Sequence, residues 1–447
     1  MLADSAGTEA LERSYRILSG DDSDERACEA IPDSACTDLP RNYLLNVANG
    51  SCTKLAEQLA GPNLVLPWLL AALGTPASIT GWLMPVKQLF SLVPQLAVSG
   101  RIRRVGVRRR VWTAAGLSQA AALLAMAAAA VWLPPLEAGL AVLALLAVFS
   151  AASGAGSVAF QDVMGKTVPK GRRGRLLSNR ALIGGALTIA AGLGLQYQLG
   201  AEAPISVYVW LLLGAAGLWA LAALLFAAVR EAPGATEGGR SPLAELGAGW
   251  ALVRSQPGYR HFLTVRALLL SVEIGMPLFV LHGRAVSDGT VLALGVFMLA
   301  VGAGNVLSSP VWGRFSDRSS RQVLEISGLL AAAIAVLALG LGQLAASQWA
   351  AWLYAPVFVL LGIAEQGVRL GRKTYLVDAA PKDQRPLYTA FANTSVGLLA
   401  LLGGALGFLA QWLSPAAAVV ALGLLGLAGA LAARALPEAS EMLDFRP

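Results

Sequence analysis

Apolar runs separated by short polar connections occupy most of this chain, from Tyr43 to Leu436. Each run is long enough to cross the hydrocarbon core of a bilayer, which is about 30 Å thick and needs roughly 20 mostly apolar residues in a helix. The pattern therefore predicts an all-α polytopic membrane protein. We place its twelve expected transmembrane helices at residues 43–71, 78–98, 111–133, 139–160, 178–198, 205–229, 261–281, 290–312, 323–346, 349–369, 388–412 and 415–435.

Basic residues mark every second connection between these spans. Arginine and lysine gather after spans 2, 4, 6, 8 and 10, whereas the alternate connections contain one basic residue, Arg284. Basic loops stay on the cytoplasmic side of a membrane. We therefore expect a multi-pass protein of a bacterial-type inner membrane, with both termini in the cytoplasm.

Composition agrees with this class and sets the first segment apart. Of 447 residues, 56% are hydrophobic and 14% are charged, whereas soluble domains average about 25% charged residues. The net charge is +7, but residues 1–40 hold ten acidic residues and three arginines. This segment predicts a mostly disordered cytoplasmic tail with one short helix at Leu11 to Leu18. The basic excess elsewhere lies in the connections and favours contact with anionic lipid over nucleic acid.

Few residues of this chain suit catalysis or metal binding. Cys28 and Cys36 lie eight positions apart with no histidine nearby, a poor spacing for a metal, and are predicted to be incidental reduced thiols. The sequence contains no nucleotide-binding loop and no zinc-type histidine spacing. We expect no enzymatic activity, no cofactor and no metal.

Two similar halves flank the longest internal connection, residues 230–260. The first half covers 41–229, the second 261–436, and a tail of 437–447 follows. Gly100 and Gly313 end spans 2 and 8 at an offset of 213 residues, and Pro169 and Pro381 follow spans 4 and 10 at an offset of 212. These near-equal offsets predict a duplication, with two six-helix halves related by pseudo-symmetry.

The sequence resembles the major facilitator superfamily. The six-plus-six layout, the long central loop and the stretch from Gly313 to Gln322 carry the resemblance, since that stretch is similar to the family signature G-x-L-a-D-R-x-G-r-k. The resemblance implies a transporter fold in which Gly313, Asp317, Arg318 and Arg321 form a loop that sets the conformational equilibrium. In the first-half copy Arg104 replaces the aspartate, which puts the equivalent contact in doubt.

Spans 1 and 2 contain charged residues at membrane depth. Steps of three and four place Asn49, Lys54 and Glu57 on one stripe of span 1, where Lys54 and Glu57 are spaced to pair. Lys87 lies near the middle of span 2, and Glu57 is a possible partner. Charges in a bilayer are costly and usually face a cavity or a partner. Either a substrate or proton site or a structural ion pair accounts for them.

Spans 7 and 10 carry two further basic–acidic sets. Arg266 and Glu273 are seven residues apart on one face, and Glu365 and Arg369 form an i,i+4 pair. The family resemblance implies that spans 1, 4, 7 and 10 line the central cavity. Glu57, Glu273 and Glu365 are candidate proton carriers because burial disfavours the charged form of a carboxylate. Arg369 has an alternative to a role in the site. Near the cytoplasmic end of its span, its charged group can reach the membrane surface while its stem stays among apolar groups.

These features predict a secondary active transporter that moves a small solute by alternating access. Lys54, Arg266 and Arg369 favour an anionic or zwitterionic solute, and protons are the expected coupling ion. A drug or metabolite exporter is an alternative, as is a non-transporting receptor or assembly factor that uses the acidic tail for docking. The fold needs no partner subunit, so we expect a monomer surrounded by lipid.

Overall fold

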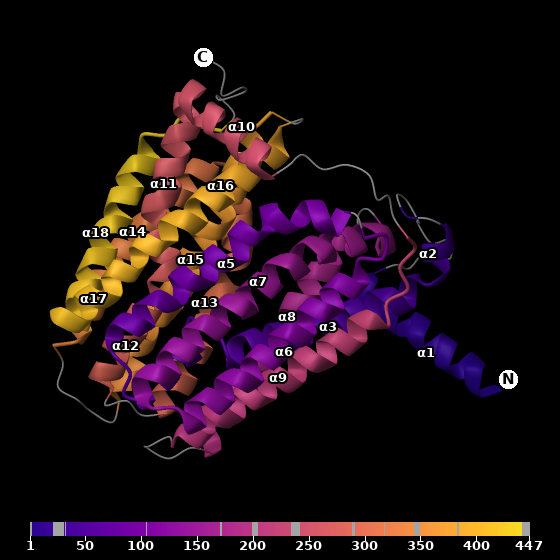
Figure 1. Cartoon of the computed structure of the whole chain (residues 1–447), viewed down its shortest axis with the longest axis horizontal. Coiled ribbons are helices and arrows are strands. Elements are labelled where there is room, and N and C mark those ends of the chain that lie inside the picture. Colours follow the sequence, from indigo (N-terminus) through magenta and orange to yellow (C-terminus); the bar gives the residue numbers. More distant parts are fainter. Residues whose placement is uncertain are drawn as a thin grey trace.

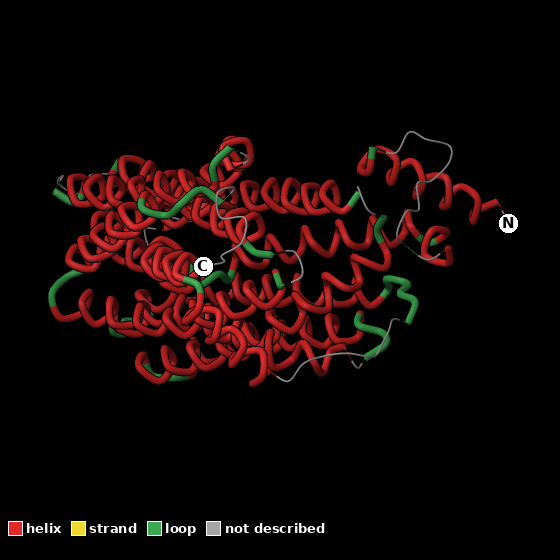
Figure 2. The backbone as a smooth tube through the Cα atoms, turned by 90° about the horizontal axis from the view of Figure 1, so that it is seen from above, coloured by secondary structure: helices red, strands yellow, loops and turns green. Residues whose placement is uncertain are grey.

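The computed structural model describes residues 2–20, 31, 33–103, 105–169, 172–198, 204–233, 242–287, 291–316, 318–343, 349–381 and 384–439. All regular secondary structure within these ranges is helical (Figures 1 and 2). The helices of residues 39–227, indigo to magenta in Figure 1, form one group, and those of residues 257–434, salmon to yellow, form a second group beside it. The predicted all-α fold with two halves is confirmed.

The first half contains a broken first helix and five continuous ones. Their bounds are α3 Leu39–Leu59 with α4 Val65–Ala72, α5 Ala77–Arg103, α6 Arg109–Trp132, α7 Pro135–Thr167, α8 Arg173–Gln198 and α9 Ile205–Ala227.

The second half repeats this order with breaks in two of its helices. Its elements are α11 Pro257–Ile274 with α12 Met276–Val286, α13 Val291–Ser316, α14 Ser320–Leu341, α15 Ala350–Ala379, the series α16 Arg385–Leu399, η1 Ala400–Gly404 and α17 Ala405–Trp412, and α18 Pro415–Arg434. The predicted central loop contains one further helix, α10 Pro242–Ser255.

Each of the twelve predicted spans coincides with a helix or a broken helix. Nine helices in the described part of the chain are long and apolar enough to cross a membrane, and α13 contains a shorter apolar stretch, Ala293–Ser308. The other two predicted spans correspond to α3 with α4 and to α5, which contain half of the polar residues predicted for the site.

The first predicted span is not continuous, and local chemistry explains the break. Residues Gly61, Pro62 and Asn63 lie between α3 and α4. Proline has no backbone N–H and its ring crowds the preceding turn, so Pro62 disfavours continuation of α3, and the chain leaves helical geometry before α4 begins. Pro277 acts similarly in the first turn of α12, next to the break at Gly275. Both breaks lie close to the site described below.

Small residues allow close helix packing within the first half. A Cβ atom at Gly154 of α7 would lie 2.5 Å from the Ser91 carbonyl oxygen of α5. This contact packs the small residues at 151–156 of α7 closely against α5, as small residues allow in membrane proteins.

The two halves are in close contact at the end away from the chain termini. A Cβ atom at Gly81 of α5 would lie 2.3 Å from the Gly407 Cα atom of α17. In the same region the Ser78 amide of α5 donates to the Gln411 side chain of α17 at 3.2 Å. Glycine pairs of this kind let helices approach closely, so this end of the inter-half interface is closed.

The first forty residues are more ordered than predicted. Residues Leu2–Ser19 form α1, which includes the short helix predicted at Leu11 to Leu18, and Asp33–Thr37 form α2, so the prediction of disorder is wrong for Leu2–Ala10 and Asp33–Thr37. The Tyr15 ring contacts the Tyr43 ring edge-on with centroids 5.3 Å apart, and the Arg172 guanidinium donates to the Ser19 carbonyl at 3.1 Å. Buried aromatic contacts compensate for the acidic composition that predicted disorder.

The cysteine prediction also needs correction. Cys36 is disulfide-bonded, whereas Cys52 of α3 has a free thiol. The predicted pair of reduced incidental thiols is therefore wrong for Cys36, because sequence spacing alone does not report how close two thiols lie. Cys28 lies outside the described residues.

Exposed tryptophans support a membrane setting. Trp132, Trp349 and Trp412 lie at the helix ends away from the termini, and each has a strongly exposed side chain. Tryptophan is enriched where a bilayer meets water, so these side chains are consistent with an interfacial belt.

Candidate functional site

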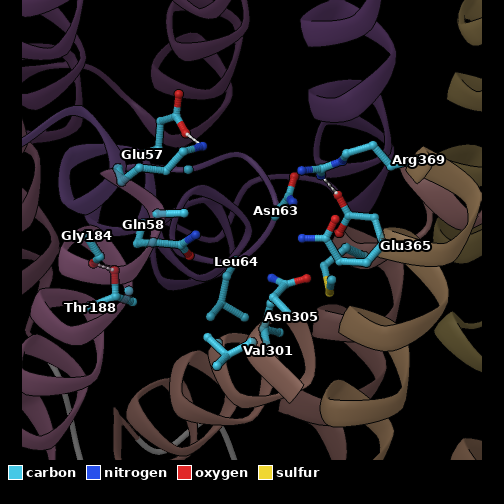
Figure 3. Close-up of a pocket in the computed structure, with 18 of the residues that line it drawn as sticks. Glu57, Gln58, Asn63, Leu64, Gly184, Thr188, Val301, Asn305, Glu365 and Arg369 are labelled. Atoms are coloured by element: carbon cyan, nitrogen blue, oxygen red, sulfur yellow. Dashed lines mark hydrogen bonds and ion pairs between the residues drawn. The ribbon is translucent and has the colours of Figure 1, made fainter. Parts of the chain in front are cut away.

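A cavity of about 530 Å³ lies between the two halves (Figure 3). This volume falls within the usual range of small-molecule sites, roughly 300–1,000 Å³. The first half contributes residues from α3, the α3–α4 break, α5 and α8, and the second half contributes residues from α12, α13 and α15. Its polar and charged lining consists of Lys54, Glu57, Gln58, Asn63, Lys87, Ser178, Thr188, Asn305, Glu365, Gln366 and Arg369.

One ion pair lies on the first-half wall of this cavity. The Lys54 ammonium is 3.1 Å from the Glu57 carboxylate, and both side chains are about half exposed. The i,i+3 spacing on α3 brings them together, as predicted from the sequence. The pair is open to water, so solvent screens the attraction between the two charges.

A second ion pair lies on the opposite wall. Figure 3 shows Arg369 and Glu365 of α15 bonded to each other across the cavity from Glu57. The Glu365 side chain is buried, whereas Arg369 is partly exposed to the cavity. Its i,i+4 spacing again matches the predicted pairing. Each half therefore brings a cation and a carboxylate to the cavity.

Lys87 of α5 also lines the cavity. It lies within electrostatic range of both Glu57 and Glu365. The direct partner of Glu57 is Lys54, however, and the described part of the chain offers Lys87 no ion pair. The sequence suggested Glu57 as a possible partner, and the structure places the two in the same cavity without a direct bond.

Asn49 lies outside this cavity. Its side-chain amide donates to the Ala222 carbonyl of α9 at 2.8 Å, and its side-chain oxygen accepts a bond of 3.4 Å from Arg180 of α8. Arg180 in turn lies over the Phe160 ring, 4.2 Å from its centroid. Asn49 thus joins three helices of the first half.

Arg266 and Glu273 form a second, buried cluster beside the cavity. Glu273 of α11 pairs with Arg372 of α15 at 3.0 Å and accepts a bond of 3.5 Å from Gln88 of α5. Arg266 donates to Asn393 of α16 at 3.3 Å. Gln88 belongs to the first half and the other residues to the second, so this cluster joins the two halves.

The predicted conformational loop makes its contacts at the end of the last helix. Gly313 lies in the last turn of α13, Arg318 is exposed, and Asp317 lies outside the described residues. Arg321 pairs with Glu438 at 2.7 Å and donates to the Arg434 carbonyl at 2.9 Å. Arg321 thus ties the start of α14 to the residues after α18.

The first half also has ionic contacts between its helix ends on this side. Arg108 pairs with Asp162, and Lys166 is 2.7 Å from Asp162 and 2.9 Å from Glu231. Glu231 also accepts the backbone amide of Arg109 at 2.7 Å. Arg104, the residue that put the family-type loop contact in doubt, lies outside the described residues.

Sequence reasoning missed several cavity residues. Asn63, Asn305 and Gln366 are uncharged, and single amides in apolar spans gave no signal of their own. Arg372 was missed as the partner of Glu273 because it follows Arg369 near the end of a span and was counted as a loop cation. A search for amides in step with charged residues would have found Gln366, which is next to a predicted glutamate.

Comparison with known proteins places these features in a family. The family model described as Major Facilitator Superfamily matches residues 49–369 and 290–443. "Uncharacterized protein Rv2209" of Mycobacterium tuberculosis and "Uncharacterized protein Mb2232" of Mycobacterium bovis are each 31% identical over 386 residues, covering 83% of this chain and 72% of the relative.

Solved transporters share the fold at low sequence identity. The nucleoside transporter NupG superimposes with a TM-score of 0.67 at 12% identity, covering 88% of this chain and 99% of NupG. The xylose transporter XylE of E. coli, in an inward open conformation, gives 0.62 at 14% identity, with 88% and 96% covered. A POT family transporter in complex with 5-aminolevulinic acid gives 0.65 at 13% identity, with 88% and 95% covered.

The matched regions together span nearly all of the two halves and include the cavity residues on both walls. The paired halves, the cavity between them and the loop contacts at the helix ends agree with that match. The chain belongs to the Major Facilitator Superfamily.

Proposed function

We propose that this protein is a secondary active transporter that moves a small anionic or zwitterionic solute across a bacterial inner membrane, coupled to protons. The observation that carries the proposal is the cavity of about 530 Å³ to which both halves contribute charged side chains. A solute bound there contacts both halves, so movement of one half against the other changes the side from which it is reached.

Closure at one end of the interface supports alternating access. The Gly81–Gly407 contact and the Ser78–Gln411 bond hold the halves together at the end away from the termini. With the termini in the cytoplasm, as the basic loops predict, the protein is closed to the outside in this structure. Transport then requires these contacts to separate in the opposite state.

Charges in the cavity support the solute class. Lys54, Lys87 and Arg369 face two carboxylates, Glu57 and Glu365. The excess cation favours an anionic group on the solute, and the carboxylates tolerate an additional positive group. The solutes named for the similar structures are a nucleoside, xylose and 5-aminolevulinic acid. They are uncharged or zwitterionic molecules small enough for a cavity of about 530 Å³.

Proton coupling rests on Glu57, Glu273 and Glu365. Each carboxylate has a basic partner within its own half, through Lys54, Arg372 and Arg369 respectively. Protonation of a carboxylate removes its attraction for the cation, so the strength of these contacts depends on proton binding. A change in one contact can then favour one of the two cavity openings.

Flux into proteoliposomes tests both parts of the proposal. Purified protein is reconstituted with and without an imposed proton gradient, offered a bacterial metabolite extract, and the accumulated compounds are identified by mass spectrometry. We expect uphill accumulation of at least one anionic or zwitterionic compound. Glu57→Gln, Glu273→Gln and Glu365→Gln should each abolish uphill but not downhill movement, whereas Glu137→Gln, at the exposed start of α7, is the matched control.

Unchanged gradient-driven accumulation in all three variants would contradict proton coupling at these residues. Absence of flux for every compound would contradict transport itself. Compounds that move only from the cytoplasmic face of the protein to the opposite face, whichever way the protein is inserted in the vesicle, would favour the exporter alternative.

The docked N-terminal helix gives the non-transporting alternative a specific test. The α1 helix packs on α3 through Tyr15 and Tyr43 and leaves Ile17 largely exposed, which offers a surface for a partner. Deletion of residues 1–20 keeps the Asp38–Arg230 pair that ties α3 to α9. Intact flux in this variant supports a transporter, whereas no flux in either protein together with loss of a co-purifying complex supports an assembly role.

A further inference from the structure

Two of the three cations in the cavity are neutralised within their own helix. Lys54 pairs with Glu57 through i,i+3 spacing, and Arg369 pairs with Glu365 through i,i+4 spacing. Because both members of each pair lie on one continuous helix, these pairs need no contact between the halves. They can persist in any arrangement of the two halves.

Lys87 differs from both. The positions three and four residues away on α5 are Leu83, Met84, Phe90 and Ser91, so its own helix offers no carboxylate. Within the described residues Lys87 makes no ion pair, although its side chain is half-buried in the cavity wall. A cation at membrane depth with no direct partner is costly, and such residues usually serve a ligand or an ion.

Lys87 lies on a helix of the first half that forms part of the interface with the second half. The α5 helix packs against α16, η1 and α17 of the other half. Its glycine contact with α17 lies on one side of Lys87, and the Gln88 bond to Glu273 lies next to it. A ligand held by Lys87 is therefore bound at the surface where the halves must move.

We propose that Lys87 anchors a single carboxylate of the solute, and that the solute is a singly charged organic acid with several hydroxyl or amide groups. This inference rests on the proposed transport function and names the substrate class of the same cavity. One free cation matches one anionic group, because a second carboxylate would have to displace Glu57 or Glu365 from its partner.

Neutral polar side chains specify the remainder of the solute. Gln58 and Asn63 lie on the first-half wall, and Asn305 and Gln366 lie on the second-half wall (Figure 3 labels all but Gln366). Amides both donate and accept hydrogen bonds, which suits hydroxyl groups. Leu64, Met276 and Val301 add an apolar floor. A solute the size of a hexose acid fits a site of this volume and lining.

A charge series on one carbon frame tests the inference. Purified full-length protein is titrated with glucose, glucosamine, glucuronate and glucarate, which are neutral, cationic, singly anionic and doubly anionic, and the shift in melting temperature is recorded. We expect glucuronate to bind about tenfold or more tightly than glucose, as a charge-assisted hydrogen bond predicts. Glucarate should bind no more tightly than glucuronate.

Variants assign the preference to Lys87. Lys87→Met should remove the difference between glucuronate and glucose, and Lys87→Arg should keep part of it. The double variant Lys54→Met/Glu57→Gln removes one cation and one carboxylate together, so it should keep the order of the four compounds even where affinity falls. Arg254→Met, on the exposed surface of α10, is the control for loss of a cation outside the cavity.

If a folded Lys87→Met protein still prefers glucuronate to glucose, Lys87 does not bind the carboxylate of the solute and the proposal is wrong. Equal or tighter binding of glucose or glucosamine than of glucuronate by the unaltered protein would overturn the substrate class, as would tighter binding of glucarate or no shift with any of the four. These failures are separate from failure of transport, because the metabolite flux assay detects movement of a solute of any charge.

Discussion

At the scale of single residues, exposure separates the intramembrane carboxylates into two kinds. The Glu273 side chain is 7% exposed and pairs with Arg372, whereas the Glu57 side chain is 45% exposed and pairs with Lys54. A buried pair depends on both partners, because removal of one leaves an uncompensated charge in a medium of low dielectric constant. An exposed pair is screened by water and contributes little.

Replacement of Glu273 should therefore destabilise the fold much more than replacement of Glu57. We expect Glu273→Gln to lower the free energy of unfolding by about 3–5 kcal/mol, because it leaves Arg372 without its carboxylate beside the buried Arg266. Glu57→Gln should cost less than about 1 kcal/mol. Denaturant titration of the purified proteins in the same detergent measures both. Equal losses in the two variants would show that exposure does not set the strength of these pairs.

Gly81 offers a second residue-scale test, at the closed end of the interface. Leucine at this position meets the backbone of Gly407, where even a Cβ atom would lie 2.3 Å from the Cα atom. Overpacking of this kind costs about 1–3 kcal/mol, so Gly81→Leu should lower the melting temperature. Gly214→Ala in α9, where no atom lies within 4 Å of the added Cβ, should be neutral or slightly stabilising. An unchanged melting temperature for Gly81→Leu would mean that the halves are not tightly packed there.

The sequence predicted which residues are charged at depth but only some of their partners. Lys54 with Glu57 and Glu365 with Arg369 were predicted because helical spacing alone brings each pair together. The pair of Glu273 with Arg372 could not be predicted, since it joins α11 to α15 and depends on how two helices pack. Asn49 illustrates the same limit. It shares one stripe of α3 with Lys54 and Glu57, but the stripe faces α9 at Asn49 and the cavity at the other two residues.

At the scale of elements, helix positions followed from the sequence and helix breaks did not. Apolar length placed every predicted span on a helix, but Gly61 and Pro62 interrupt the first one. A proline in an apolar run is compatible with a kink, a break or the first turn of a new helix, and the neighbouring helices decide among these. The break exposes Asn63 to the cavity, so the feature that was missed is one that shapes the site.

Two carboxylates at equivalent positions tie the third helix of each half to the end of its last helix. Glu231 lies four residues beyond the end of α9 and accepts the Arg109 amide at the start of α6. Glu438 lies four residues beyond the end of α18 and pairs with Arg321 at the start of α14. Carboxylates are favourable at helix N-termini because of unpaired N–H groups and the helix dipole. The duplication inferred from loop spacing thus extends to a specific contact.

Removal of either carboxylate should loosen only its own half. We expect Glu231→Ala to speed amide hydrogen exchange about five- to tenfold at residues 108–112, corresponding to roughly 1 kcal/mol for a lost helix-terminal contact. Glu438→Ala should do the same at residues 320–324. Each variant serves as the control for the other in exchange measured by mass spectrometry. Faster exchange in both halves of either variant would contradict two independent contacts.

At the scale of the whole molecule, the arrangement of the halves decides what the cavity can do. Duplication and topology were predictable because they repeat along the chain, in loop charges and spacing. Closure at one end was not, since it depends on glycines at 81 and 407 that come together from different halves. In the proposed transport cycle the closed end and the cavity together represent one of two states, and the protein must leave that state in each turnover.

Reversible locking of the closed end tests whether that separation is required. In a protein with Cys52 replaced by serine, the substitutions Ser78→Cys and Gln411→Cys place two thiols where α5 and α17 are already hydrogen-bonded. A short dithiol-reactive reagent that reductant can cleave then joins the halves at this point. If the contacts must open in each cycle, cross-linking abolishes metabolite flux, and reductant restores it. The two proteins that carry only one of the introduced cysteines, treated identically, should keep their flux, because a reagent attached at one end cannot hold the halves together. Full flux in the cross-linked protein would mean that solute passes without separation of α5 from α17, and rocking of the halves would then be excluded.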